Sequence, residues 1–329
     1  MTVDATLASA SNVLVYSAMT VYAGALGAFA TDLSAMGRAM GRAVRPARDL
    51  VTTTPRDQAL RSPVEGNEVL DHGGGGRRAA SIAVSLTWLA FFLHTGAVVL
   101  RGASAHRVPW GNMYEFSVTG AAVVTAVFLG LLLRRDLRYL GTFVIGPVLL
   151  TLGLAVVVLY TESAQLVPAL QSYWLVIHVS VAFVASALLT IGFSATVLQL
   201  VQQRREQSRS AGNPPSRGRF MDALPGSAEL ERAGYRLVAI AFPLWTFTLV
   251  AGAIWAEKAW GRYWGWDPKE IWTFVIWVVY AAYLHARATR GWDGRRAAYL
   301  ALAGYACVLI NFLVVNVFFS GEHSYAGIG

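Results

Sequence analysis

A dense group of tryptophans is the feature of this sequence with the clearest capacity to hold a ligand. Trp255, Trp260, Trp264, Trp266 and Trp272 lie within eighteen residues, WAEKAWGRYWGWDPKEIW, between two apolar runs. Flat side chains at this density predict a platform for a flat, apolar molecule. The alternative is an aromatic belt, because Trp and Tyr gather at membrane interfaces in any case. A belt scatters its aromatic residues around helix ends, so five tryptophans in one short stretch favour the platform.

Two histidines are candidates for metal ligation beside this platform. His178 lies near the start of one apolar run and His323 lies just past the end of the last one. If these two ends face the same side of a membrane as the tryptophans, the two imidazoles can provide both axial ligands of a haem iron. The alternative for each histidine taken alone is a polar residue at the membrane interface. The pair beside this stretch favours ligation, since ionisable groups at a membrane edge are functional candidates.

A third histidine, His285, is too far along its helix to share that iron. It follows Ile271 by fourteen residues, which is about 21 Å at the rise of an α-helix. A lone histidine at this depth indicates either a second site or a packed, neutral imidazole. His94 lies too high on its own span to pair easily with His285, and His106, in an outer loop, is a reserve candidate for a ligand. We therefore expect the partner of His285 to lie on another chain.

The end of the tryptophan stretch also has a structural interpretation. Asp267 is a good helix N-cap, Pro268 suits the first helical position, and Glu270 completes a capping-box pattern. Capping alone can account for both carboxylates. A functional addition is that the amides of this helix N-terminus and nearby cations meet the carboxylates of a bound haem. Those cations are Lys258, Arg262 and Lys269.

The elements that must position these residues are membrane helices. The chain is 55% hydrophobic and only 14% charged, which is typical of a polytopic membrane protein. Eight apolar stretches are long enough, or nearly so, to cross a bilayer, and the fold class we predict is all-α, a bundle of about eight transmembrane helices. The stretches are 13–30, 81–100, 115–133, 139–159, 173–201, 235–255, 271–289 and 297–319.

The distribution of basic residues sets the expected orientation. The first of them is Arg38, after the first apolar stretch, so the N-terminus carries no secretory signal and should lie outside. Alternation then places 22 of the 27 Lys and Arg residues in inside segments, as the positive-inside rule requires. The tryptophan stretch and the C-terminus fall outside. This topology explains the net charge of +8, so we expect no nucleic-acid partner.

Two polar segments should be cytoplasmic linkers. Residues 31–80 carry eight arginines and a run of four glycines, and 202–234 is rich in Arg, Ser and Pro. We therefore divide the chain into 1–80, a first transmembrane helix with a basic linker, and 81–329, a membrane domain with an external tryptophan-rich loop at 255–272. Cys307 is the single cysteine, which excludes an internal disulfide, a CxxC pair and a cysteine zinc site.

Several short motifs, in this order, resemble one known family. They are NMYE at 112–115, His178-Val-Ser, AEKAWGRYWGWDPKEIW, YLHAR around His285, and an ending HSY that contains His323. Together they cover roughly residues 106–326. The chain is similar to the CcsA/ResC type of cytochrome c biogenesis protein, the haem-handling membrane proteins of System II with a tryptophan-rich WWD domain.

The resemblance implies a function, a site and partners in the cell membrane. His178 and His323 would ligate haem b at the tryptophan domain, and His285 would ligate haem within the membrane with a ligand from a CcsB/ResB-like subunit. Apocytochrome c, with its CxxCH motif, would receive the haem by thioether attachment, and a thioredoxin-like thiol reductant is a further partner to consider. Haem lyase activity would need the CcsB/ResB-like partner.

Three other functions stay open from the sequence. The chain would be a haem exporter or chaperone without ligation activity if it acted as the related System I proteins do. It would be a transporter of another substrate if the tryptophans were only a belt, and a purified protein without haem would then be expected. It would be a scaffold for a respiratory complex if both outer histidines were dispensable.

Overall fold

The structure, a computed structural model, describes residues 3–43, 72–165, 170–212 and 219–323 and is all-α there, with no strand in those residues. Eight helices in them are long and apolar enough to cross a membrane. The predicted fold class is therefore confirmed. The helices are α1 (Ala5–Ala43), α3 (His72–Ser104), α4 (Met113–Leu132), α5 (Gly141–Val157, after the 3-10 turn η1, Arg138–Leu140), α6 (Tyr173–Ser210), α7 (Ser227–Trp260), α8 (Pro268–Arg290) and α9 (Gly294–Leu309). The last span continues through a π-helix, η4 (Ile310–Val315), into the short α10 (Asn316–Phe318).

Several helices extend well beyond the predicted spans. Helix α1 has 39 residues, which is about 58 Å at 1.5 Å per residue, against a hydrocarbon core of about 30 Å. The predicted linker 31–80 is therefore wrong at both ends, because α1 runs to Ala43 and α3 begins at His72; residues 44–71 lie outside the described part. The linker 202–234 is wrong in the same way, since α6 runs to Ser210, a 3-10 turn (η3, Arg219–Ala223) follows, and α7 begins at Ser227.

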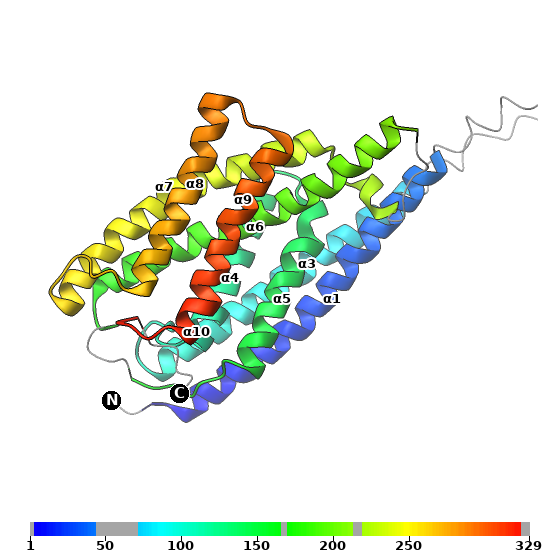
Figure 1. The fold of residues 1–329 in the computed structure, drawn as a ribbon. Coiled ribbons are helices and arrows are strands. Elements are labelled where there is room, and N and C mark those ends of the chain that lie inside the picture. Colours follow the sequence, from blue (N-terminus) through cyan, green and yellow to red (C-terminus); the bar gives the residue numbers. More distant parts are fainter. Residues whose placement is uncertain (1–2, 44–71, 166–169, 213–218, 324–329) are drawn as a thin grey trace, which may run out of the picture.

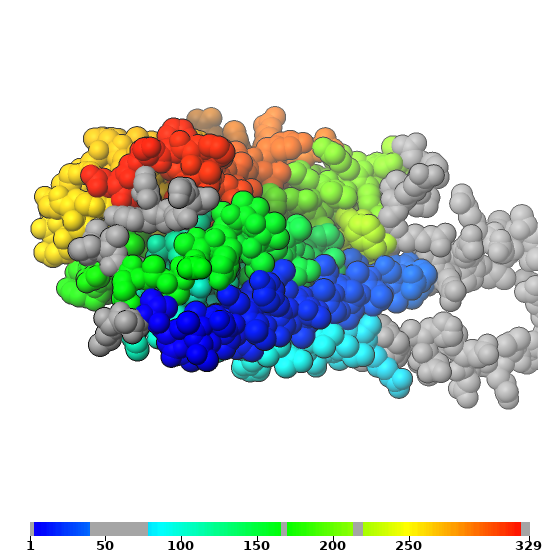
Figure 2. Space-filling model, turned by 90° about the horizontal axis from the view of Figure 1, so that it is seen from below, coloured from blue at the N-terminus to red at the C-terminus, as the bar shows by residue number. Residues whose placement is uncertain are grey.

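The helices form pairs that pack around a shared interior. Helices α1 and α3 lie side by side along one flank, and α6 packs along α7 in the same manner (Figure 1). Helices α8 and α9 form the opposite flank (Figure 1). Figure 2 shows α1 and α3 along one edge of the molecule, with the last described span, in red, toward the other edge. Helices α4, α5 and α6 lie between the two flanks.

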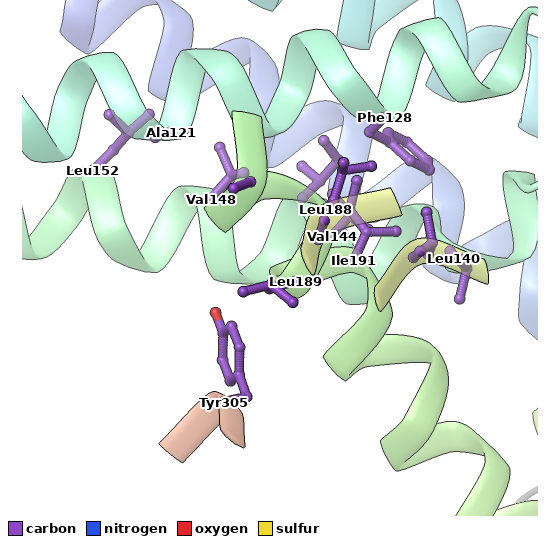
Figure 3. Packing of buried hydrophobic residues seen from close by; sticks show 14 of the residues in the cluster. Ala121, Phe128, Leu140, Val144, Val148, Leu152, Leu188, Leu189, Ile191 and Tyr305 are labelled. Atoms are coloured by element: carbon purple, nitrogen blue, oxygen red, sulfur yellow. The ribbon is translucent and has the colours of Figure 1, made fainter. Parts of the chain in front are cut away.

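A large hydrophobic cluster lies where α4, α5 and α6 meet (Figure 3). Large aliphatic and aromatic side chains interdigitate there, and Tyr305 approaches them from α9 (Figure 3). The Tyr305 hydroxyl donates a hydrogen bond of 3.0 Å to Oγ1 of Thr190 on α6. This bond satisfies a polar group that would otherwise be costly inside an apolar bundle. It also ties the α8–α9 flank to the central helices.

A buried ionic cluster fixes the connections at the end of the bundle where α4 begins. Glu115 is almost completely buried and accepts hydrogen bonds from Arg101 Nε (3.1 Å), from Arg107 Nη1 (2.6 Å) and from the Gly111 amide (2.9 Å). Arg107 also donates to the carbonyl of Ala164, in the connection that leads toward α6. Glu115 therefore holds two arginines and a loop in place.

Candidate functional site

A cavity of about 280 Å³ lies inside the bundle and is bordered by residues of α4 to α9. Its walls are mainly apolar, as ligand sites in proteins usually are. His178, Trp255, Trp264, Lys269, Glu270 and His323 all border it. The two histidines predicted as a pair, which are 145 positions apart in the sequence, therefore line one space.

His178 is held by its packing against α7. It lies in the second turn of α6, which Ser172 caps by accepting a hydrogen bond from the Trp174 amide. Its Nδ1 is 2.9 Å from the backbone carbonyl oxygen of Thr248. Because a carbonyl can only accept, Nδ1 carries the proton and the lone pair is left on Nε2. A metal-ligating histidine in a protein usually has this arrangement.

Gly252 makes this position of the ring possible. A Cβ atom at Gly252, one turn after Thr248, would lie 2.7 Å from Cε1 and 2.9 Å from Nδ1 of His178. No side chain larger than hydrogen leaves the imidazole its present place against the α7 backbone.

His323 lies in the segment that follows α10, and its ring packs against two of the predicted tryptophans. Its centroid is 4.9 Å from that of Trp260 and 5.4 Å from that of Trp255. Trp255 also lies nearly parallel to the His178 ring, at 6.1 Å. Trp255 therefore contacts both histidines.

Asp267 connects His323 to the start of α8. The predicted capping box is present, with Asp267 as the cap and Glu270 as its partner. The same carboxylate accepts from His323 Nδ1 (2.9 Å) and from the Glu322 amide (2.7 Å). Burial alone would raise the Asp267 pKa, but the bonds from His323, from the Lys269 amide and from the Glu322 amide lower it to about 2. Asp267 is therefore ionised at neutral pH and accepts the Nδ1–H of His323, so Nε2 is the nitrogen of that ring left to bind a metal.

The tryptophan stretch is shorter as a loop than predicted. Helix α7 includes Trp255 and Trp260, and α8 begins before Trp272, so only residues 261–267 connect the two helices. Trp264 borders the cavity. Trp266 has a left-handed backbone, with φ of 60°, and is 70% exposed. Trp260, Trp266 and Trp272 are not among the residues that border the cavity, although Trp260 reaches His323.

Glu270 holds the turn of this loop through two hydrogen bonds. Its Oε2 accepts from the amides of Gly265 (2.8 Å) and Asp267 (3.1 Å), on either side of Trp266. These two hydrogen bonds hold the loop in a sharp turn that directs Trp266 away from the bundle. Such a strained backbone persists only where surrounding bonds over-determine it.

Three other histidines, His285, His94 and His106, do not border the cavity. His285 is exposed on α8. His94 is completely buried, with Nδ1 3.3 Å from the Tyr22 hydroxyl. His106 is exposed at the end of α3. The structure thus separates His285 from the pair and gives His94 a place in the core.

The region that contains this cavity matches a known protein family. A model described as "Cytochrome C assembly protein" matches residues 110–323. The chain belongs to this family. The match includes the whole cavity wall and all of His178, His285 and His323, and it leaves out α1 and α3.

Curated relatives in the cytochrome c assembly family cover most of the chain. A "Cytochrome c biogenesis protein CcsA" of Prochlorococcus marinus (strain MIT 9215) is 38% identical over 262 residues, which is 74% of this chain and 84% of the relative. A protein of the same name from Guillardia theta is 36% identical over 258 residues, 74% of this chain and 85% of the relative. These relatives support a role in cytochrome c biogenesis for this multi-pass membrane protein.

A solved structure shows the same fold at low sequence identity. "Cytochrome c Heme Lyase CcmF" superposes over 100% of this chain with a TM-score of 0.61 and 16% identity. The chain spans about half the length of that protein, 49%. This likeness concerns the arrangement of helices alone.

Two residues that position His178 were not predicted from the sequence of this assembly protein. Thr248 contributes a backbone carbonyl, and Gly252 contributes the absence of a side chain. Nothing in the sequence marks Thr248 for this contact, because every residue carries a backbone carbonyl. A glycine in the middle of an apolar helix is a weak signal, because it also serves close helix packing.

Proposed function

We propose that this protein binds haem b as a substrate in the cavity, with His178 and His323 as the two axial ligands, and presents it for attachment to apocytochrome c. The observation that carries the proposal is the state of the two imidazoles. Each has Nδ1 bonded to an oxygen, at 2.9 Å in both cases, and each borders the same cavity. Two Nε2 lone pairs are what a six-coordinate haem iron requires.

The surrounding residues suit a flat apolar ring. Trp255 contacts both imidazoles, and Trp264 forms part of the wall. In the attachment reaction, the S–H bonds of the two client thiols add across the vinyl C=C bonds of the haem, which needs no external oxidant. The client histidine then replaces one axial ligand. The protein contributes position and orientation, which lower the entropic part of the barrier, while the haem supplies the reactive group.

His285 forms a second haem site in this proposal, shared with a CcsB/ResB-like subunit. The histidine is exposed on α8, and α8 has the smallest buried share, 17%, of the eight membrane helices. Phe274, Val278 and His285 recur at helical spacing, so they lie on one stripe of α8. That stripe is exposed along its length and is available to a partner helix that brings the other ligand.

The distribution of basic residues supports an extracytoplasmic position for the tryptophan loop, and we propose that apocytochrome c is matured on that side. Haem would pass from the His285 site to the outer pair, and a thioredoxin-like reductant would keep the client thiols reduced. Lyase activity would belong to the complex with the partner. Cys307, half-buried in α9, takes no part, because the thiols come from the client.

The alternative is a haem exporter or chaperone that delivers haem without attaching it. The same cavity and histidines serve that function equally well. Export alone predicts that the complex with its partner binds haem but forms no covalent cytochrome c from purified apocytochrome.

An absorption spectrum of the purified complex with its partner tests the proposal. We expect a Soret band that weakens in a His178→Ala/His323→Ala double variant and, separately, in His285→Ala, with loss of cytochrome c maturation in both. His106→Ala, an exposed histidine outside both sites, is the matched control and should match the wild type. A wild-type complex with no Soret band, from cells supplied with haem, would refute the haem site and favour a transporter of another substrate.

A further inference from the structure

Lys269 is placed to act on the cargo in a way that the two histidines cannot. It lies in the first turn of α8 and borders the cavity together with His178 and His323. Its Nζ donates hydrogen bonds of 2.9 Å to the Asn311 carbonyl and of 2.9 Å to Oδ1 of Asn316. An ammonium group has three N–H donors. Two are used by these bonds, and both acceptors are uncharged.

The carboxylates near Lys269 are engaged elsewhere. Asp267 accepts from His323, from the Glu322 amide and from the backbone amide of Lys269. Glu270 accepts from two loop amides and lies 3.9 Å from Arg262. Within the described part of the chain neither carboxylate forms an ion pair with the Lys269 ammonium, although the charge of Asp267 is close enough to act on it. A charged group at the wall of a mainly apolar cavity, as Lys269 is, normally has an oppositely charged partner.

The other cations of the tryptophan loop do not reach the cavity. Lys258 is exposed and pairs with Glu257 at 2.8 Å. Arg262 lies between Glu270 and Glu322, with its guanidinium over the Trp260 ring. Among the described residues that border the cavity, Lys269 is therefore the one lysine or arginine.

We propose that Lys269 binds a carboxylate of the cargo, a propionate of the haem, and so fixes which edge of the ring faces the client. This rests on the proposed function. Two axial ligands fix the iron and the plane of the ring, but they leave rotation about the line through both nitrogens free. The propionates occupy one edge of haem and the vinyl groups lie away from it. A single cation beside the ring therefore decides where the vinyl groups point.

The π-helix η4 prepares Lys269 for this role. A π-helix leaves carbonyls outside the ordinary α-helical bonding pattern, and such segments are frequent at functional sites. Asn311 lies within η4 and Asn316 directly follows it. Together they hold the lysine side chain before a ligand arrives, so little conformational entropy is lost on binding.

The role of Lys269 is tested by comparing the affinity of the protein for haem with its affinity for haem dimethyl ester, which lacks both carboxylate charges. The complex with its partner is purified in a His285→Ala background, so that only the outer site binds, and each porphyrin is titrated by its Soret absorbance. We expect the ester to bind at least about tenfold more weakly than haem, the effect of one charge-assisted hydrogen bond. In Lys269→Gln, which keeps N–H donors for Asn311 and Asn316, the ratio should fall to about twofold or less. Lys269→Arg should keep most of the difference in affinity between haem and its ester.

Lys258→Gln is the matched control, because it removes a nearby cation that does not border the cavity. Its ratio should equal that of the wild type. An equal affinity for both porphyrins in the wild type, or an unchanged ratio in Lys269→Gln, would overturn the proposal for Lys269 and leave the haem site standing. Absence of binding by either porphyrin would instead overturn the proposed function.

A second measurement does not depend on the folding of any variant. A water-soluble carbodiimide activates a propionate, and an amine in contact with it then forms an amide with release of the urea. Mass spectrometry of the haem-loaded wild-type complex should locate a porphyrin adduct on Lys269. An adduct on Lys258 or another lysine, or none at all, would count against the assignment.

Discussion

Replacement of Gly252 by alanine should disturb His178 without removing any ligand. The added methyl carbon would lie 2.7 Å from Cε1 and 2.9 Å from Nδ1 of the ring. Carbon atoms in good contact are about 3.5 Å or more apart, so the ring or the helix must move by about 0.8 Å. The same movement would stretch the 2.9 Å bond between Nδ1 and the Thr248 carbonyl beyond the usual range for N–H···O bonds.

Two consequences follow from that displacement, and they can be measured separately. Overpacking of this kind costs about 1–3 kcal/mol of stability. Loss of a bond that orients a metal ligand reduces metal affinity by about 10–100-fold. We therefore expect Gly252→Ala to be folded but to bind haem at the outer site about tenfold or more weakly. The assay is a haem titration of the complex in the His285→Ala background, with thermal unfolding measured on the same samples.

Two other glycines provide matched controls for this variant. A Cβ at Gly304 would lie 2.8 Å from the ring of Tyr280, which is an equal clash away from His178, whereas a Cβ at Gly130 would have nothing within 4 Å. Gly304→Ala should lose stability and keep its haem affinity, and Gly130→Ala should change neither. Haem affinity of Gly252→Ala equal to the wild type would refute the argument, as would an equal loss of affinity in Gly304→Ala.

Three further predictions concern the loop, the cap and the ionic cluster. Trp264→Ala should weaken the Soret band and Trp266→Ala should leave it nearly intact, since only the first borders the cavity; equal effects would favour a loop that acts as one unit. Asp267→Ser keeps a good helix cap but loses the carboxylate that accepts from His323, so haem affinity should fall about tenfold with little change in melting temperature, whereas Asp267→Asn should lie between it and the wild type. Glu115→Gln leaves buried guanidinium groups without their carboxylate, and a loss of about 3–5 kcal/mol is expected, seen as a lower yield of monodisperse protein and a lower melting temperature; an unchanged melting temperature would contradict the role given to the cluster.

The membrane helices were predictable because the lipid phase imposes long apolar runs. What hydropathy could not predict is where each helix ends. Helix α6 continues to Ser210 through a polar segment, and there Arg205 and Arg209 bond Asp222 of the following turn. Long polar side chains such as Arg and Gln are good helix formers, so a helix continues past the hydrophobic window until a cap or a turn stops it.

The candidate site was predictable from residue types, and its construction was not. The residue types histidine and tryptophan alone indicate metal ligation and binding of a flat ring. The capping box at Asp267 follows from a local sequence pattern, and the structure confirms it. The bond that His323 donates to Asp267 joins residues 56 positions apart, and no local pattern encodes it. Thr248 acts through its backbone, which every residue possesses. Ligation of iron by either histidine stays a prediction.

The π-helix in the last span amounts to one extra residue in an otherwise α-helical element. It turns everything that follows by about 100° relative to an uninterrupted α-helix. Tyr305, before it, can therefore face Thr190 while Asn316, after it, faces Lys269. The two bonds belong to two different helical registers of one span. Removal of a single residue from 310–315 would make the span one continuous α-helix with a single register. The span would then lose either the bond of Tyr305 to Thr190 or the bond of Asn316 to Lys269.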